Sequence, residues 1–545
     1  MKKLVLAAAL MTITAAPALA ETSPPDKNKP DATRSADLDK GVMFSPESST
    51  TLGSVTVEGR RVDYQAVAGT LVVHAKGWDD AATRDAGGDG KDQVDKANAK
   101  PEASMFYVAY FKTGAPSESR PIIFLYNGGP GSSTMWLHMG AFGPRRVVTL
   151  DDAHMPAAPY RLVDNTYSLL DVADLVFIDA PGTGFGRVAG KDKEKAFFGL
   201  DPDAYTFSQF ITGFLSRYGR WNSPKYLFGE SYGTTRSAVL AMELETGEGV
   251  DLNGVVLLSE VLNFDLGADT PQFNPGTDQA YITTLPTFAA TAWYHNRLGG
   301  DRPADLPTFL HEVEQFAQTD YALALQAGSK LDPARRQTIA ERLSRYTGLP
   351  VAYVMKSDLR IDGGQFDKML QDSDGLTTGR LDTRFSGPDI DPLSREADYD
   401  PQSAAIKSAY VSALNDYVRK TLNFGAGKSY RPSIDTGDSW SFSHQQPNAP
   451  ISIPGIINVM PDLAVAMKYN PSLKIMVNGG YFDLATPYFA GQYEMSHLQI
   501  PQNLQGNIEY HYYPSGHMVY AHEQSLKDLH DNVAAFVRRT DNLSS

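Results

Sequence analysis

Ser231 lies in a Gly-x-Ser-x-Gly segment whose spacing suits a nucleophile. The segment, Gly229-Glu230-Ser231-Tyr232-Gly233, directly follows a short apolar run and directly precedes a helical pattern. A nucleophilic serine at such a turn adopts a strained backbone with almost no room beside it, so glycine is needed two residues to either side. The motif alone arises by chance, but its place between a strand and a helix is typical of a nucleophile. We therefore predict that Ser231 is a nucleophile.

A serine hydroxyl is a weak nucleophile until a base takes its proton and a carboxylate orients that base. Among the histidines after Ser231, His517 differs because it follows the last predicted strand through the tight turn Pro514-Ser515-Gly516. The others lie in helical patterns, in an insertion or inside a strand. Asp483 follows the preceding predicted strand, which gives the chain order Ser, Asp, His of a known type of triad. Asp483 could also cap a helix, and one residue can do both.

The glycine-rich segment Asn127-Gly128-Gly129-Pro130-Gly131-Ser132-Ser133 follows another apolar run. Acyl transfer places negative charge on a substrate oxygen, which is stabilised by one amide after the nucleophile, here that of Tyr232, and one from a glycine-rich loop. A phosphate cradle would instead need a following Gly-Lys-Ser or Gly-Lys-Thr, which this segment lacks, and it contains Pro130. The segment therefore favours an oxyanion hole.

The elements that must position these residues alternate along the chain after Pro121. Short apolar runs that end in glycine or a polar residue are typical of buried parallel strands, and the helices between them predict a doubly wound α/β sheet. Before Pro121, alternating patterns at 54–57, 64–74 and 105–112 predict antiparallel hairpins. The predicted parallel strands are 122–126, 175–178, 226–228, 255–258, 474–477 and 508–513, and the predicted helices beside them include 203–218, 235–245 and 523–539.

This alternation stops between about 263 and 461, where helical patterns dominate at 281–297, 306–327, 333–346 and 403–422. An insertion of about 200 residues is too long for a loop, so we predict a mainly helical cap domain over the sheet. The predicted organisation is a signal peptide at 1–20, a flexible leader at 21–51, a hydrolase core at 52–262 and 462–545, and the cap at 263–461.

The N-terminus predicts export. Lys2 and Lys3 precede a short apolar run, and Ala18-Leu19-Ala20 is a small-x-small cleavage site, so we expect cleavage after Ala20. A retained membrane anchor is the less favoured alternative because the apolar run is short for a span. The chain has no cysteine and would fold without disulfides, which fits a bacterial periplasm, or secretion, better than a eukaryotic secretory route.

Composition excludes several chemistries. The 545 residues contain no cysteine, which rules out thiol nucleophiles, cysteine-ligated zinc and iron–sulfur clusters. The net charge of −15 argues against nucleic acid or an anionic membrane as the main partner. We expect no cofactor and no metal, because the acidic residues show no ligand spacing and predict solvated loops. These acidic residues are Asp85, Asp89, Asp92, Asp382, Asp389, Asp391, Glu396, Asp398 and Asp400.

Several of these motifs, in this order, resemble the serine carboxypeptidases, a branch of the α/β-hydrolases. The resemblance runs from about Pro121 to the end of the chain, and the helical insertion stands where that family carries its cap. It implies Ser231 as nucleophile, His517 as base and Asp483 as its partner. The segments that carry it are 127–133, Gly143-Pro144, 165–168, 176–181 with Gly184-Phe185, 229–232, Asp483 and 516–519.

The resemblance further implies two sets of binding groups. The amides of Gly129 and Tyr232 would form the oxyanion hole. Asn127, Gly128 and Glu230 would bind the terminal carboxylate of a peptide, which confines such enzymes to chain ends.

The chain departs from the family at Ala141. The family usually pairs the glutamate before the serine with a second one at this place, and two such carboxyls share a proton, so that one stays neutral and donates to a carboxylate. Either Arg145, Arg146 or Arg236 takes over this recognition, or the restriction to chain ends is relaxed. For each arginine a structural ion pair is the favoured interpretation.

We thus expect a serine-type carboxypeptidase that acts on peptides through an acyl-enzyme. The alternatives are an esterase or acyltransferase with the same triad, since fold and triad do not fix the substrate, or a less restricted peptidase. Trp136 and His138 lie near the oxyanion loop and are candidates to line the pocket. The side-chain preference, the pH optimum and the oligomeric state cannot be predicted from the sequence.

Overall fold

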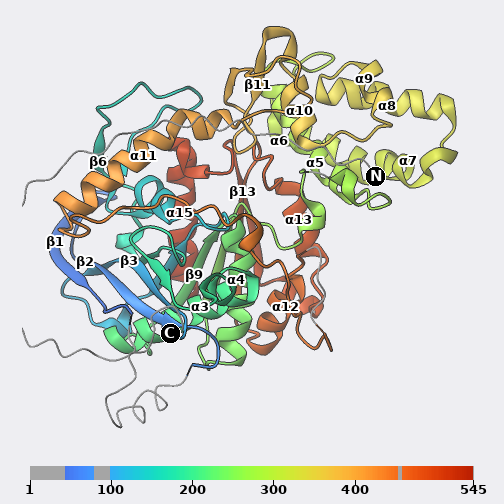
Figure 1. The fold of residues 1–545 in the computed structure, drawn as a ribbon. Coiled ribbons are helices and arrows are strands. Elements are labelled where there is room, and N and C mark those ends of the chain that lie inside the picture. Colours follow the sequence, from blue (N-terminus) through green and yellow to red (C-terminus); the bar gives the residue numbers. More distant parts are fainter. Residues whose placement is uncertain (1–42, 79–98, 270, 452–456, 544–545) are drawn as a thin grey trace, which may run out of the picture. The chain divides into compact units, whose positions relative to one another are not determined.

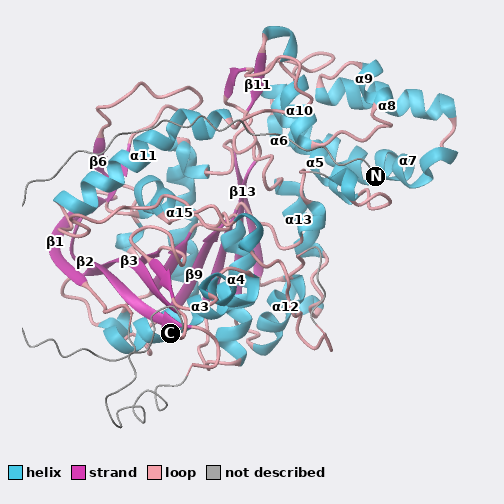
Figure 2. Cartoon of the chain, viewed as in Figure 1, coloured by secondary structure: helices cyan, strands magenta, loops and turns pink. Residues whose placement is uncertain are grey.

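A central sheet carries the catalytic candidates in this computed structural model, which describes residues 43–78, 99–269, 271–451 and 457–543. In the described part of the chain, ten strands form one sheet, nine of them in the order β1-β2-β3-β7-β4-β9-β10-β13-β14, with β8 paired to β3. Figures 1 and 2 show the sheet running through the middle of the view, with helices on both of its sides.

The sheet has an antiparallel and a parallel part, as the sequence patterns predict. Strands β1, β2, β3 and β7 pair antiparallel, and β7, β4, β9, β10, β13 and β14 pair parallel. The strands of this sheet are β1 (Ser48–Val57), β2 (Arg60–His74), β3 (Glu102–Lys112), β4 (Ile122–Tyr126), β7 (Asp174–Ile178), β8 (Arg187–Ala189), β9 (Lys225–Glu230), β10 (Gly254–Leu258), β13 (Lys474–Gly480) and β14 (Ile508–Tyr513).

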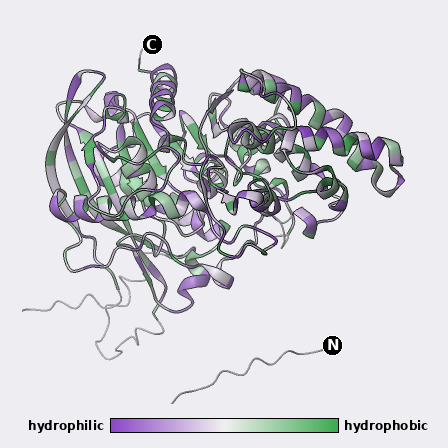
Figure 3. Ribbon diagram, turned by 90° about the horizontal axis from the view of Figure 1, so that it is seen from above, coloured by the Kyte–Doolittle hydropathy of each residue, from purple (hydrophilic) through white to green (hydrophobic). Residues whose placement is uncertain are grey.

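Alternate residues of each parallel strand face opposite sides of the sheet, and both sides are apolar. Phe124 and Leu227 belong to one hydrophobic cluster with α3 (Leu200–Tyr218), α4 (Tyr232–Thr246) and α12 (Met460–Tyr469). Their strand neighbours Leu125 and Phe228 belong to a second cluster with α15 (Glu523–Thr540). Figure 3 shows these central strands as mostly hydrophobic. The continuous apolar runs of the sequence arise because a sheet covered on both faces has no polar face.

The first part of the insertion is a helical group with its own hydrophobic cluster, which includes Phe288, Leu310 and Leu343. In Figure 1 its helices lie together in the upper right of the view. They are α5 (Gln279–Tyr294), α6 (Leu306–Phe316), α7 (Ala322–Ala327), α8 (Pro333–Thr347), α9 (Val351–Lys356) and α10 (Gly363–Met369), followed by the short pair β11 (Leu376–Thr378) and β12 (Ser386–Pro388).

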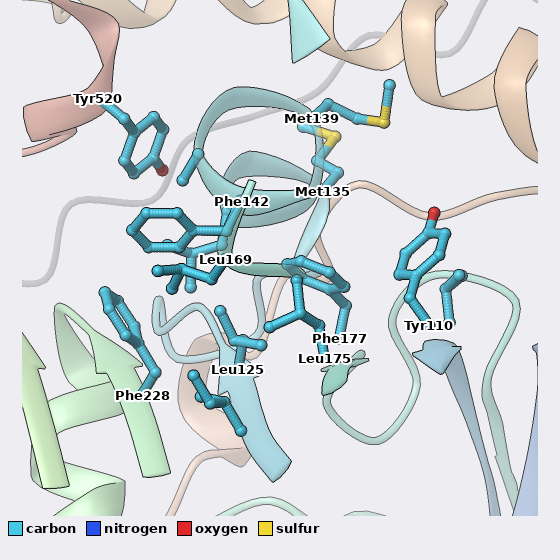
Figure 4. Packing of buried hydrophobic residues seen from close by; sticks show 14 of the residues in the cluster. Tyr110, Leu125, Met135, Met139, Phe142, Leu169, Leu175, Phe177, Phe228 and Tyr520 are labelled. Carbon is cyan, nitrogen blue, oxygen red and sulfur yellow. The ribbon is translucent and has the colours of Figure 1, made fainter. Parts of the chain in front are cut away.

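The last helix of the insertion, α11 (Pro401–Lys420), packs differently. Its residues Ile406, Tyr410, Leu414 and Tyr417 belong to the same cluster as the sheet and α15. Figure 4 shows the neighbouring part of this cluster, which includes Phe142 and Phe228, whose ring centres lie 5.3 Å apart. The segment predicted as one cap therefore consists of a helical group and a helix of the core.

The remaining elements connect these layers. They are β5 (Arg145–Val147) and β6 (Leu162–Asp164), which pair with each other, and α2 (Lys193–Phe197), α13 (Tyr488–Ser496) and α14 (Gln502–Gln505). No helix of the described residues is long and apolar enough to cross a membrane.

Two predictions concern the N-terminal region. The predicted signal peptide, most of the leader and the acidic residues Asp85, Asp89 and Asp92 lie outside the described residues. The leader was expected to reach residue 51, but β1 begins at Ser48, because Ser48 pairs with Gly69 at the start of a long antiparallel register.

Replacing Leu414 by Ala tests whether α11 is part of the core. Leu414 is 1% exposed in the sheet cluster, so we expect the variant to lose about 2–5 kcal/mol of unfolding free energy by urea denaturation. Leu323→Ala is the control, because that side chain is 58% exposed on α7 and its loss is expected to cost about 0.5 kcal/mol or less. Equal effects of the two substitutions would contradict the assignment of α11 to the core.

Candidate active site

Ser231 lies at the sharp turn between β9 and α4 that the motif predicts. Its backbone has φ 62° and ψ −132°, in the region that non-glycine residues rarely adopt. A Cβ at Gly229 would lie 2.2 Å from the carbonyl oxygen of Gly233, so no larger residue fits there. The Ser231 amide donates to the carbonyl of Leu258 on the next strand at 3.0 Å, which fixes the turn to the sheet.

His517 and Asp483 lie side by side on the loops that follow β14 and β13. The Nδ1 atom of His517 donates to Oδ2 of Asp483 at 2.8 Å, and the Asp483 side chain is fully buried. The Thr486 amide and hydroxyl also donate to Asp483, at 3.0 and 2.6 Å. Asp483 therefore orients the imidazole and holds the turn before α13 at the same time. Because Nδ1 carries the donated proton, Nε2 is left as the acceptor that a base needs.

The glycine-rich loop after β4 lies against the first turn of α4. A Cβ at Gly128 would lie 2.5 Å from the amide nitrogen of Tyr232, and Gly129 has φ 112°. The amide of Tyr232 is among the first amides of α4, which have no acceptor within the helix. The structure thus brings the backbones of both predicted oxyanion residues to one place beside Ser231.

Arg236 contacts the backbone of this loop. Its guanidinium is fully buried, donates to Oδ2 of Asp203 at 2.6 Å and to the carbonyl of Asn127 at 2.9 Å, and lies over the ring of Phe207. The loop is also joined to the end of the insertion, since the amide of Ser133 donates to the carbonyl of Pro432 at 2.9 Å. The loop is therefore held both by Arg236 of α4 and by the segment at the end of the insertion.

A cavity of about 760 Å³ joins these groups. The predicted nucleophile and base both line it, as do Gly129 and Tyr232 and the predicted binding residues Asn127, Gly128 and Glu230. Asp483 does not line it and reaches it through His517. Much of the wall is apolar, which suits an uncharged side chain or acyl group. The apolar residues in this wall include Trp136, Val261, Phe264, Phe273, Ile406, Phe442 and Ile457.

Glu230 is a buried carboxyl at the edge of this cavity. The Tyr520 hydroxyl donates to its Oε1 and Oε2 atoms at 3.1 and 2.9 Å. Burial raises the pKa of Glu230 to about 7, although His517, Tyr520 and the side chain of Asn127 act to lower it. The carboxyl is therefore mostly neutral in mild acid, where it can donate a proton to an anion.

The charge of Asp483 sets the basicity of His517. Burial alone would lower the pKa of His517, but the charge and hydrogen bond of Asp483, together with Glu230, outweigh burial, and the pKa is raised above its ordinary value. A raised pKa makes the imidazole a better proton acceptor once it is neutral.

The insertion contributes a strap, residues 380–384, that joins the two loops of the triad. The His517 amide donates to the carbonyl of Leu381 at 2.7 Å, and the Leu484 amide donates to that of Arg380 at 3.1 Å. Asp382 and Arg384 form an ion pair that is almost fully buried, and a Cβ at Gly516 would lie 2.4 Å from the Asp382 Cβ. The strap therefore packs directly against the loop that carries the base.

Arginine does not replace the second acid at the places considered from the sequence. Arg145 pairs with Asp164, Arg146 pairs with Glu523, and Arg236 is buried with Asp203, and none of these three described arginines lines the cavity. For all three the structural interpretation is the better one.

Trp136 lines the cavity, whereas His138 does not. His138 is buried, stacks on Phe177 with ring centres 4.5 Å apart and shares a hydrogen bond with the Tyr110 hydroxyl. Burial lowers the pKa of His138 to about 3, so it is a neutral residue of the core.

The prediction of a solvated acidic loop is wrong for three of its residues. Asp382 is buried against Arg384, and the Asp389 side chain pairs with the buried Lys368 at 3.1 Å. Asp400 accepts from the amide of Ser403 at 2.6 Å and so caps α11. The partners are Arg384 two residues further on, Lys368 in another element and the first turn of α11, and composition alone reveals none of these pairings.

Sequence reasoning missed three residues of the site. Arg380 lines the cavity and forms a two-pronged ion pair with Asp269 across it, with Nε to Oδ1 at 2.8 Å, and nothing in the local sequence indicates this. Thr486 and Tyr520 each lie three residues after a triad member, at Asp483 and His517. This spacing from a predicted triad residue is the feature of the sequence that could have pointed to Thr486 and Tyr520.

The strand order and the turn at Ser231 define an α/β-hydrolase fold, in which Asp483 and His517 pair on the loops after β13 and β14. Within this class, residues 94–263 match the model of the serine carboxypeptidase family. This matched segment contains the glycine-rich loop and Ser231. Asp483 and His517 lie beyond it, and their assignment rests on the geometry.

Known relatives match part of the chain at low identity. Serine carboxypeptidase-like 36 of Arabidopsis thaliana is 26% identical over 179 residues, which are 31% of this chain and 34% of that protein. Pheromone-processing carboxypeptidase KEX1 of Phytophthora infestans is 31% identical, with 24% and 21% covered. Retinoid-inducible serine carboxypeptidase of Rattus norvegicus is 30% identical, with 29% and 32% covered. The chain thus spans only about a fifth to a third of the length of these relatives.

Solved structures resemble the chain weakly. A proline iminopeptidase from Mycobacterium smegmatis covers 91% of this chain and 100% of its own, with a TM-score of 0.32 and 11% identity. A monoglyceride lipase variant from Saccharomyces cerevisiae covers 81% and 93%, with a TM-score of 0.32 and 9% identity. At these values the fold assignment rests on the strand order and the turn at Ser231.

Replacing Arg384 by Met tests the strap. The substitution leaves the buried carboxylate of Asp382 without its partner, so we expect a loss of about 3–5 kcal/mol of unfolding free energy in urea. Lys420→Met is the control, because its ion pair with Asp416 is exposed and contributes about 0.5 kcal/mol or less. A loss of stability no larger than that of the control would show that the strap is not anchored by this pair.

Proposed function

We propose that this chain is a serine carboxypeptidase that removes C-terminal residues from peptides. The observation that carries the proposal is the buried carboxyl of Glu230, held next to the side chain of Asn127 in the same cavity as Ser231 and His517. Glu230 directly precedes the proposed nucleophile Ser231, and its neutral carboxyl can donate a hydrogen bond to an anion. This pair of groups suits a peptide in which the free carboxylate lies one residue from the scissile bond. The match of residues 94–263 to the serine carboxypeptidase family supports it.

The reaction follows from the placement of the groups. His517 Nε2 takes the hydroxyl proton of Ser231 as the oxygen bonds to the scissile carbonyl carbon. The negative charge moves to the carbonyl oxygen, where the amides of Gly129 and Tyr232 donate to it. His517 then passes the proton to the leaving amine, the C–N bond breaks, and an acyl-enzyme remains on Ser231. A water molecule deprotonated by His517 releases the acid and restores the hydroxyl.

The carboxylate of the substrate would be bound by neutral and backbone groups. Glu230 donates its carboxyl proton, and the Asn127 side chain and the Gly128 amide supply further donors. The Asn127 side chain is fixed for this task, because its Oδ1 accepts from the amide of Leu137 at 3.1 Å and its NH₂ group is left to face Glu230. These donors leave the bound carboxylate with partners for both oxygens.

Three substrates test the proposal: an N-blocked dipeptide with a free C-terminal acid, its C-terminal amide, and an aryl ester of the same N-blocked amino acid. We expect the free acid to be turned over with kcat/KM about ten-fold or more above the amide, since a hydrogen bond to a charged group is worth about 1.5–3 kcal/mol. Turnover of the ester with no turnover of the free acid would exclude a carboxypeptidase and leave an esterase.

Labelling with a fluorophosphonate tests whether Ser231 is the nucleophile, independently of the substrate. We expect the parent protein to be labelled and Ser231→Ala not to be, while Ser132→Ala, in the neighbouring glycine-rich loop, keeps its label. A parent protein that does not react would contradict any serine hydrolase.

The pH dependence of free-acid turnover should have two limbs. Activity rises as His517 loses its proton, above the ordinary histidine pKa because the pKa of His517 is raised. Binding of the free acid falls as Glu230 ionises, and its pKa of about 7 places this limb near neutrality. Turnover of the ester depends on the deprotonation of His517 but not on the protonation state of Glu230. We therefore expect the ratio of free-acid to ester kcat/KM to fall by up to about ten-fold per pH unit above about pH 7.

Glu230→Gln is the matched variant for this pH profile. Its amide can still donate to a carboxylate but does not titrate near neutral pH, so the alkaline limb of free-acid turnover should disappear. An alkaline limb that persists in this variant would show that another group titrates there.

A further inference from the structure

Tyr520 is the direct partner of Glu230, and the sequence did not predict any role for it. Its hydroxyl lies within 3.1 Å of both carboxyl oxygens, and the residue is only 3% exposed. It belongs to the short helical turn Val519–Ala521, three residues after His517. One loop therefore carries both the base and the group that holds Glu230.

The ring of Tyr520 packs against the turn that contains Ala141. A Cβ at Gly140 would lie 2.8 Å from Cδ2 of Tyr520 and 2.5 Å from the Tyr410 hydroxyl. Ala141 is itself fully buried and brings no titratable group to this place. Figure 4 shows Tyr520 beside Phe142 of the same turn. The space between this turn and Glu230 is thus closed by tyrosine rings.

We propose that Tyr520 is the positioning residue for recognition of the substrate carboxylate, and that its hydroxyl does for Glu230 what a second carboxyl would do. This inference rests on the proposed carboxypeptidase function. When Glu230 is protonated, one of its oxygens accepts from Tyr520, and the other carries the proton that is donated into the cavity. The hydroxyl thereby fixes which oxygen faces the substrate.

A tyrosine suits this role because it keeps its proton. Burial raises the pKa of Tyr520 well above its ordinary value, and the nearby Glu230 adds to this effect. The hydroxyl therefore stays a donor at every pH at which the site works, whereas a second carboxyl would itself ionise. The site has one titrating acid in place of two, and this predicts a single alkaline limb.

Charged and titratable groups approach Glu230 from each loop around it. His517 and the hydrogen bonds from Tyr520 and Asn127 favour its ionised form, while burial and the charge of Asp483 favour its neutral form. The Tyr410 hydroxyl on α11 also interacts with its charge. Loss of the Tyr520 hydroxyl removes one influence that favours ionisation, so Glu230 should then titrate at a higher pH.

Tyr520→Phe tests the inference with the free-acid dipeptide and the aryl ester. We expect its kcat/KM on the free acid to fall about ten-fold or more, mainly through KM, while ester turnover stays within about two-fold. The alkaline limb of free-acid turnover should move to higher pH. The rate of fluorophosphonate labelling of Ser231 should stay close to that of the parent, which shows that the variant is folded.

Tyr417→Phe is the matched control. Tyr417 is a buried tyrosine of the same hydrophobic cluster, and its hydroxyl accepts from that of Tyr110 at 3.1 Å, so the variant also loses a buried hydrogen bond. We expect it to keep the parent ratio of free-acid to ester turnover and the parent alkaline limb.

The outcomes separate this inference from the proposed function. If the parent prefers the free acid and Tyr520→Phe keeps that preference and its pH limb, this inference is wrong and the carboxypeptidase proposal stands. If free-acid and ester turnover fall together in Tyr520→Phe, the residue has a general structural role and the inference is also wrong. If the parent turns over the ester but not the free acid, both proposals fail.

Discussion

The positive φ of 62° at Ser231 is the constraint around which the active site is arranged. A serine held in this conformation costs free energy that the surrounding packing must supply. The packing is visible on both sides of the turn, where Gly229 lies against Gly233 and Gly128 lies against Tyr232 with no room for a side chain. Because α4 and the glycine-rich loop are in contact at this point, the position of Ser231 is tied to that of the backbone at Gly128.

The residues proposed for catalysis and those proposed for substrate recognition lie close together in the sequence. Three residues predicted or proposed for recognition are near neighbours in sequence of a proposed catalytic group: Glu230 precedes Ser231, Asn127 lies two residues before Gly129, and Tyr520 lies three after His517. The residues proposed for catalysis and for recognition therefore share the same three loops.

The sequence predicted the parts of the fold that local patterns determine. The parallel strands could be located because a strand buried on both faces is apolar throughout, and β4 and β14 have the predicted bounds. Ser231, His517 and Asp483 follow strands through recognisable turns. Arg380 and Asp382 could not be placed, because their roles depend on contacts with Asp269 and with Gly516 that are distant in sequence.

The insertion illustrates why its role could not be predicted from its helical pattern. A cap that only covered the site would contact it through side chains alone. Here the backbone of the insertion forms hydrogen bonds with the backbone of the loops around the site. The carbonyls of Arg380 and Leu381 accept from the amides of Leu484 and His517, and Pro432 accepts from Ser133 in the glycine-rich loop. These amides would otherwise be buried without acceptors, at a cost of about 1–3 kcal/mol each. The core loops that carry His517, Asp483 and the glycine-rich segment therefore have all of these backbone partners only when the insertion is folded onto them.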